Sequence, residues 1–174
     1  MNTPNKLTVL RMLLVPVFMV VYMVESIPFG TLFAAFIFVV ASITDWLDGY
    51  LARKNNIVTN FGKFMDPLAD KLLVTGALLC LMERDIVAFW IVMLIIAREF
   101  IVSGLRLVAV TKGIVIAAGS LGKIKTVLQL IAVTAAILIP SKLIVDILIY
   151  ISALMTVISG ADYLIRNRKV FLDA

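Results

Sequence analysis

Long apolar stretches alternate with short polar segments along the whole chain. The apolar stretches extend over about residues 7–24, 30–52, 60–82, 86–110, 121–139 and 143–165. An α-helix needs roughly 20 mostly apolar residues to cross the hydrocarbon core of a bilayer, and each stretch is close to that length. Lipid offers no hydrogen-bond partner to an open backbone, so helices are the expected form there. The pattern therefore predicts an all-α, polytopic membrane bundle of six transmembrane helices.

The segments between the apolar stretches are short, and they contain no Ser/Gly linker, low-complexity tract or clear internal repeat. We therefore expect a single membrane domain over residues 1–174. Within this domain, residues 1–6 are expected to form a short interfacial segment and residues 166–174 a basic cytoplasmic tail.

Composition agrees with a membrane protein, because the chain is 63% hydrophobic, whereas about half of a soluble domain is apolar. The single cysteine excludes an internal disulfide, and the absence of histidine excludes imidazole chemistry. Acid–base chemistry is then left to Asp, Glu, Lys, Tyr or Cys. The net charge of +5 is better explained by loops that face anionic lipid than by nucleic acid, which we do not expect as a partner.

Basic residues gather at one end of the predicted helices. That side receives Lys6, Arg11, Arg53, Lys54, Lys63, Lys112, Lys123, Lys125, Arg166, Arg168 and Lys169. The opposite side receives Glu25, Glu83, Arg84, Asp85 and Lys142. Lys and Arg concentrate in cytoplasmic loops, so we predict a multi-pass protein of the cell membrane with both termini in the cytoplasm.

Four aspartates lie near the cytoplasmic ends of the second and third predicted helices. Asp45 and Asp48 are three residues apart, and Asp66 and Asp70 are four apart, so each pair shares a helix face. Carboxylates that converge repel one another unless cations balance them. Hard oxygen ligands suit Mg²⁺ or Mn²⁺, and two such ions form a clamp for phosphoryl chemistry. We predict a site for two divalent cations, facing the cytoplasm.

Small residues border both aspartate pairs: Gly49 and Ala52 follow the first, and Gly62 precedes the second. Glycine is costly inside a helix, so it indicates the close approach of a ligand or of another helix, and both interpretations stay open here. Arg53, beside the first pair, is suited to binding phosphate with two hydrogen bonds.

The aspartates also have simpler explanations. Asp66, which precedes Pro67, has the form of a helix N-cap. Asp45 and Asp48 are open to roles as capping residues or as ion-pair partners of the basic residues that follow them.

The stretches DWLDGYLAR (45–53) and GKFMDPLAD (62–70) together resemble the signature of the CDP-alcohol phosphatidyltransferase family. That signature is D-x-x-D-G-x-x-A-R, a spacer, and G-x-x-x-D-x-x-x-D, and every position of it is present here. The resemblance implies that the chain transfers the phosphatidyl group of CDP-diacylglycerol to an alcohol, with CMP as the leaving group. It also implies a homodimer.

The resemblance further implies a role for each signature residue. Asp45, Asp48 and Asp66 would ligate the metals, while Asp70 would contact the second metal and act as general base on the acceptor hydroxyl. The residues implied to hold CDP-diacylglycerol are Asp48, Gly49, Ala52, Arg53, Thr59 and Gly62.

The N-terminal stretch PNKLTVLR resembles the family segment that closes over the nucleotide. This makes Asn5 and Thr8 further candidates for binding CDP-diacylglycerol. The alternative is a short interfacial helix that Thr3 caps, with Pro4 at its first position.

Four basic residues, Arg98, Arg106, Lys123 and Lys125, predict a pocket for an acceptor that carries a phosphate. The stretches IIAREFIVSGLRLVA and GKIKT around them resemble those of bacterial phosphatidylglycerophosphate synthases, which implies sn-glycerol 3-phosphate as the acceptor. The positive-inside rule also explains the two lysines. Arg98 is also open to pairing with Glu99, which we interpret as a structural residue that orients an arginine.

Three alternatives to this function stay open. The same chemistry with serine or inositol phosphate as acceptor is the nearest of them. A small cation transporter would need acidic residues near the midplane and access from both sides, whereas the acids here lie at one end. The third alternative is a structural subunit that catalyses no reaction, but such a subunit would not require the complete signature.

Asp146 is isolated in the last predicted helix, and we assign it no role.

Overall fold

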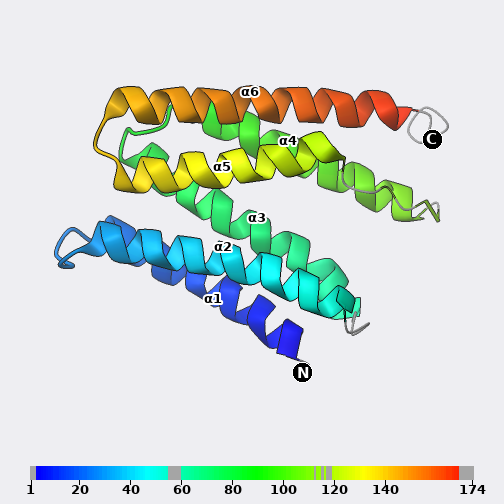
Figure 1. Ribbon diagram of the computed structural model, residues 1–174, viewed down its shortest axis with the longest axis horizontal. Helices are drawn as coiled ribbons and strands as arrows, with labels where there is room; N and C mark the ends of the chain where they lie inside the picture. Colours follow the sequence, from blue (N-terminus) through cyan, green and yellow to red (C-terminus); the bar gives the residue numbers. More distant parts are fainter. Residues whose placement is uncertain (1–2, 55–59, 112, 115, 117–118, 169–174) are drawn as a thin grey trace. The chain divides into compact units, whose positions relative to one another are not determined.

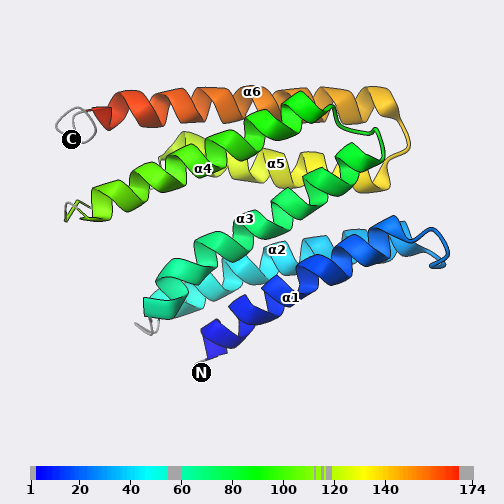
Figure 2. The same ribbon diagram turned by 180° about the vertical axis from the view of Figure 1, so that it is seen from behind.

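The computed structural model describes residues 3–54, 60–111, 113–114, 116 and 119–168 (Figures 1 and 2). For residues 3–7, 45–54, 60–64, 66–67 and 70 it describes only the backbone. The described part of the chain contains six α-helices and no β-strand. The predicted all-α fold is therefore confirmed.

The helix bounds follow the hydrophobic pattern closely. The helices are α1 (Thr3–Met23), α2 (Gly30–Lys54), α3 (Asn60–Glu83), α4 (Phe89–Thr111), α5 (Ser120–Leu138) and α6 (Lys142–Arg166). The largest difference is at the start of α1, which already includes residues 3–6. Pro16 lies inside this helix, a position that is tolerated when neighbouring helices and side chains satisfy the freed carbonyl.

The chain divides into two compact units. The first comprises Met1–Ile86 and Val133–Pro140, and the second comprises Val87–Ala132 and Ser141–Ala174. The first unit therefore contains α1, α2 and α3, and the second contains α4, most of α5, and α6.

In the first unit, α1 packs against both α2 and α3 (Figure 1). The Phe18 ring of α1 lies 5.9 Å from the ring of Tyr22 and 5.9 Å from that of Phe38 in α2, measured between centroids. On the α3 side, a Cβ atom added to Gly76 would lie 3.1 Å from the Cγ1 atom of Val15. The glycine thus allows α1 and α3 to approach closely, as small residues do between membrane helices.

In the second unit, α4 packs against α6, and the two helices run in the same direction (Figure 2). Trp90 near the start of α4 lies against Tyr150, with ring centroids 6.0 Å apart. Farther along both helices, Arg98 contacts Ser159. The two contacts join residues that are nearly the same distance apart in the sequence, and they define the register of the two helices.

α6 places its polar side toward the protein and its apolar side outward. Its buried residues include Ser152, Thr156, Ser159 and Gly160. Its exposed large side chains are Leu143, Ile144, Ile147, Tyr150, Ile151, Leu154, Val157, Ile158, Leu164 and Ile165. Water favours the opposite arrangement, whereas lipid favours small and polar residues at helix contacts.

α1 also buries polar residues, here beside the buried apolar residues Val15 and Phe18, and exposes apolar ones. Thr8 and Arg11 are buried, while Leu10, Leu13 and Val17 are exposed. By length and composition, two helices of the described residues are able to cross a membrane, namely Ser120–Leu138 and Lys142–Arg166, and Thr8–Met23 and Gly30–Thr44 are shorter apolar helices. These exposed apolar faces support association with a membrane, while the full count of six spans stays a prediction.

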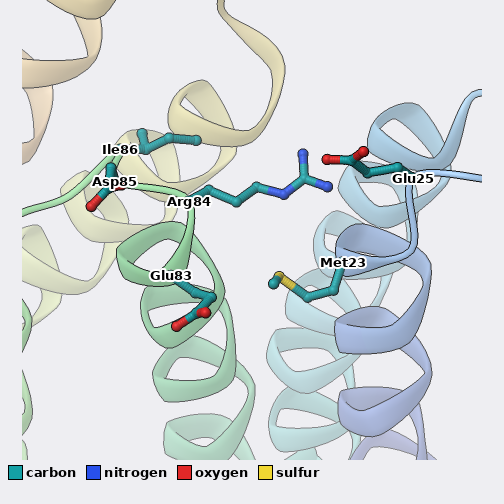
Figure 3. A pocket seen from close by; sticks show the side chains of 6 residues that line it. All are labelled: Met23, Glu25, Glu83, Arg84, Asp85 and Ile86. Atoms are coloured by element: carbon teal, nitrogen blue, oxygen red, sulfur yellow. The ribbon is translucent and has the colours of Figure 1, made fainter.

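Arg84, just after α3, ties the end of that helix to the end of α1 (Figure 3). Its Nη2 atom donates a hydrogen bond of 2.7 Å to the carbonyl oxygen of Tyr22, and its guanidinium lies 4.6 Å from the centroid of the Tyr22 ring. The last carbonyls of a helix lack intrahelical donors and carry a partial negative charge, so a cation there stabilises the helix end. Beside Arg84 lies an open hollow of about 530 Å³, lined also by Met23, Glu25, Glu83, Asp85 and Ile86.

We predict that Arg84→Gln lowers the midpoint of thermal unfolding in detergent. The substitution removes a charged hydrogen bond and the cation–π contact, which together are worth about 1–3 kcal/mol. The control is Arg166→Gln, because Arg166 is 71% exposed and its described ion pair is with Asp162, one turn away on the same helix. Such exposed pairs contribute about 0–1 kcal/mol. Equal midpoints for the two variants would contradict the role of Arg84.

Candidate functional site

The four predicted metal ligands lie on two helices of the first unit that contact each other. Asp45 and Asp48 belong to α2, and Asp66 and Asp70 belong to α3. Both helices are continuous through these positions, so each pair lies one turn apart on one helix face. Their side chains are outside the described part of the structure. The helices therefore fit the predicted carboxylate faces, and the metal-binding roles stay predictions.

The helix bounds exclude the capping explanations for these aspartates. α3 begins at Asn60, so Asp66 and Pro67 lie within the helix and not at its N-cap. α2 continues to Lys54, so Asp45 and Asp48 do not cap its end. The ion-pair and the metal-binding explanations both stay open.

Apart from Thr59, the predicted ligands of CDP-diacylglycerol lie near the N-terminal ends of α1 and α3 and the C-terminal end of α2. Thr8 is the member whose side chain is described, and it is buried in α1. Thr59 lies outside the described residues. Of the others only the backbone is described, in α1 for Asn5, in α2 for Gly49, Ala52 and Arg53, and in α3 for Gly62.

Arg11 is a further residue of this region, and the sequence assigned it no role in the site. It was counted with the charges of the cytoplasmic side, and it is 3% exposed within α1. Its Nε atom donates a hydrogen bond of 3.2 Å to the carbonyl oxygen of Ala41 in α2. Ala41 lies one helical turn before Asp45, so this arginine reaches the helix that carries the first aspartate pair. The sequence held one indication of this, because Arg11 follows the predicted ligand Thr8 by one helical turn and therefore shares its helix face.

The second unit brings together two of the four predicted phosphate ligands. The Nη1 atom of Arg98 lies 3.0 Å from the Oε1 atom of Glu99. The Nζ atom of Lys125 pairs with the same carboxylate oxygen. α4 and α5 thus present two cations on either side of one carboxylate. The pairing of Arg98 with Glu99, one of the alternatives from the sequence, is therefore present.

Lys125 is not a loop charge, because it is 3% exposed. The positive-inside rule alone therefore does not explain it. Lys123, in contrast, is exposed at the start of α5, as that rule predicts. Arg106 is also exposed, and its guanidinium lies 5.6 Å from the centroid of the Tyr163 ring. Among the described contacts, Arg106 and Lys123 do not join the Arg98 cluster.

α6 supplies further groups that the sequence analysis missed. The Nη2 atom of Arg98 donates a hydrogen bond of 3.0 Å to the Oγ atom of Ser159. A Cβ atom added to Gly160 would lie 3.1 Å from the Cγ atom of Arg98. The signal was the spacing of Ser152, Thr156 and Ser159 within an apolar span, since polar residues at such intervals mark the inward face of a membrane helix.

Comparisons with known proteins agree with the signature. Residues 1–158 match the family model described as CDP-alcohol phosphatidyltransferase. The chain is 48% identical to the CDP-diacylglycerol–glycerol-3-phosphate 3-phosphatidyltransferase of Bacillus subtilis (strain 168), over 95% of each chain. It is 40% identical to the protein of that name from Rickettsia bellii (strain RML369-C), over 98% of this chain and 97% of the relative. For the protein of that name from Haemophilus influenzae, the identity is 39%, over 99% and 96% respectively.

The two lysines of α5 give a matched pair for testing the buried cluster. We predict that Lys125→Met lowers the midpoint of thermal unfolding in detergent by more than Lys123→Met does. The first change removes a buried partner of Glu99, and losing one partner of a buried pair costs more than about 1 kcal/mol. The second removes an exposed charge and should cost less than that. A larger loss for Lys123→Met would contradict the arrangement around Glu99.

Proposed function

The chain belongs to the CDP-alcohol phosphatidyltransferase family, and we propose that it transfers the phosphatidyl group of CDP-diacylglycerol to sn-glycerol 3-phosphate. The products are phosphatidylglycerophosphate and CMP, so the protein is a transferase of phospholipid biosynthesis. The observation that carries this proposal is the complete family signature on α2 and α3, within a chain that is alike over nearly its full length to relatives named for this reaction.

We propose that Asp45, Asp48, Asp66 and Asp70 hold two divalent cations, Mg²⁺ or Mn²⁺. The support is the donor set, since carboxylate oxygens are the ligands that these hard cations prefer. Bound there, the cations would neutralise the diphosphate and the developing charge on the leaving CMP. The spacing of the aspartates on two helices in contact is consistent with such a site.

The chain's own residues have distinct tasks in this proposal. Asp70 accepts the proton of the acceptor hydroxyl as that oxygen bonds to the lipid-side phosphorus of CDP-diacylglycerol. The bond from this phosphorus to the oxygen of the CMP group breaks, and CMP leaves with that oxygen. Arg53 binds the nucleotide diphosphate, while Gly49, Ala52 and Gly62 leave room for it. Asn5, Thr8 and Thr59 complete the nucleotide site.

For the acceptor, we propose that its phosphate binds to Arg98 and Lys125, with Arg106 and Lys123 nearby on the same two helices. The support is the cluster at Glu99, where two cations meet at one carboxylate oxygen. A phosphorylated acceptor suits such a site, since arginine and lysine form charge-assisted hydrogen bonds with phosphate. Serine carries no phosphate, and the names of the relatives favour glycerol 3-phosphate over inositol phosphate.

We further propose that all six helices span the cell membrane, with both termini and the active site on the cytoplasmic side, and that two copies form a homodimer. The exposed apolar faces of α1 and α6 support the spans. The excess of Lys and Arg on one side supports the orientation. The family supports the dimer. A lipid substrate then keeps its acyl chains in the bilayer while its headgroup enters the polar site.

The enzymatic test is the release of CMP by detergent-solubilised protein given CDP-diacylglycerol, Mg²⁺ or Mn²⁺, and one acceptor at a time. We expect release with glycerol 3-phosphate, loss of release with EDTA, and recovery when the cation is restored. Asp70→Asn should lower the rate about 100-fold or more, because a general base contributes at least that factor. Glu25→Gln, at an exposed carboxylate outside the proposed site, is the control. Release with serine alone would contradict the proposed acceptor, and an Asp70→Asn variant as active as wild type would contradict the proposed base.

The topology is tested separately with a protease-cleavable tag placed after Ala174. We expect an external protease to leave the tag intact in spheroplasts and to remove it in inside-out vesicles, because the basic C-terminal residues favour the cytoplasm. Removal of the tag in intact spheroplasts, with a cytoplasmic marker still protected, would overturn the orientation.

A further inference from the structure

Arg98 is held from two helices and still has an unused donor. Its Nη1 atom donates to Glu99 and its Nη2 atom to Ser159 of α6, both over 3.0 Å. Its Nε atom is buried and has no hydrogen-bond partner among the described residues. A buried N–H group without a partner is costly. An acceptor atom of a ligand would supply the hydrogen bond that the Nε–H group of Arg98 does not make.

Glu99 is the group that keeps two cations together. One of its oxygens, Oε1, accepts from both Arg98 and Lys125. The side chains of all three are largely enclosed, with exposures of 16% for Arg98, 19% for Glu99 and 4% for Lys125. Two cations in such surroundings repel each other strongly, and a carboxylate between them offsets that repulsion. Glu99 therefore holds the two cations close to each other.

Gly160 forms the other wall of the arginine site. An added Cβ atom there would lie 3.1 Å from the Cγ atom and 3.7 Å from the Nε atom of Arg98. The first distance is tighter than an ordinary contact, so an added Cβ atom requires the side chain of Arg98 to shift by a few tenths of an ångström. Gly104, on the same helix as Arg98, is different, because an added Cβ atom meets nothing within 4 Å there.

We infer that Glu99 and Gly160 are positioning residues for the acceptor: together they hold Arg98 and Lys125 in the geometry that binds the phosphate monoester of the acceptor. The inference rests on the proposed function and extends it, since neither residue belongs to the family signature or to the predicted phosphate ligands. Neither touches the reacting atoms. We expect them to affect the binding of the acceptor and not that of CDP-diacylglycerol. The predicted ligands of CDP-diacylglycerol belong to α1, α2 and α3 and to the sequence just before α3.

The test measures CMP release while one substrate is varied and the other is saturating. We expect Glu99→Gln to raise the KM for glycerol 3-phosphate about tenfold or more, and Gly160→Ala to raise it about threefold to tenfold, the range of a partly lost charge-assisted contact. The KM for CDP-diacylglycerol should stay within about twofold of wild type, because its predicted ligands are different residues that these substitutions do not change. Gly104→Ala is the matched control and should leave both values unchanged.

A second measurement guards against a fold defect. Isothermal titration of glycerol 3-phosphate into each variant, after its thermal midpoint has been compared with wild type, should give weaker binding for Gly160→Ala and unchanged binding for Gly104→Ala. If Glu99→Gln does not fold, the comparison of Gly160→Ala with Gly104→Ala still tests whether Gly160 positions Arg98 for the acceptor.

The outcomes separate the inference from the function on which it rests. Wild-type activity with glycerol 3-phosphate, together with variants whose acceptor KM is unchanged or whose two KM values rise equally, would overturn the inference and leave the function standing. Wild-type protein that uses only an acceptor without a phosphate would overturn both.

Discussion

Polar side chains in an apolar chain must find their partners inside the protein, because lipid tails offer none. Several charged side chains of the described helices follow this constraint. Arg11 donates to a carbonyl of α2, and Arg84 donates to a carbonyl at the end of α1. Glu99 joins Arg98 to Lys125. Many large apolar residues face outward around this core, and they form surfaces that lipid can cover.

The charged groups of the two units differ in kind. The first unit carries the carboxylates of α2 and α3, which are suited to cations and a nucleotide diphosphate. The second unit carries a cation pair on α4 and α5, backed by Ser159 and Gly160 of α6. A reaction between a lipid diphosphate and a phosphorylated alcohol needs both kinds of site. The proposed function thus assigns each unit one substrate, and it explains why so apolar a chain retains charges within its helices.

The sequence predicted the helices well, because the apolar stretches end at polar or helix-breaking segments, such as the charged run at 83–85 or Pro140. It also predicted two carboxylate-bearing helices, since a spacing of three or four residues determines the shared face once the helix exists. The count of charges by side gave less detail. It placed Arg11 and Lys125 with the cytoplasmic charges, but a count by side does not show which helix face a residue occupies, and both side chains are buried.

Ser159 and Gly160 could not be assigned a partner from the sequence. Their contact with Arg98 depends on the register of α6 against α4, and small residues in an apolar helix are compatible with many registers. Asp66 was ambiguous for a related reason. The pair Asp66-Pro67 has the form of a helix start, and only the observed start of α3 at Asn60 excludes that explanation. Local patterns predicted where helices form, while contacts between helices required the structure.

The central claim is that the hydroxyl oxygen of glycerol 3-phosphate attacks the lipid-side phosphorus of CDP-diacylglycerol. The most direct measurement follows ¹⁸O placed in the primary hydroxyl of glycerol 3-phosphate, with mass spectrometry of both products. The account predicts that the label is retained in the phosphatidylglycerophosphate formed and that CMP carries none. Labelled CMP, or a lipid product without the label, would contradict it.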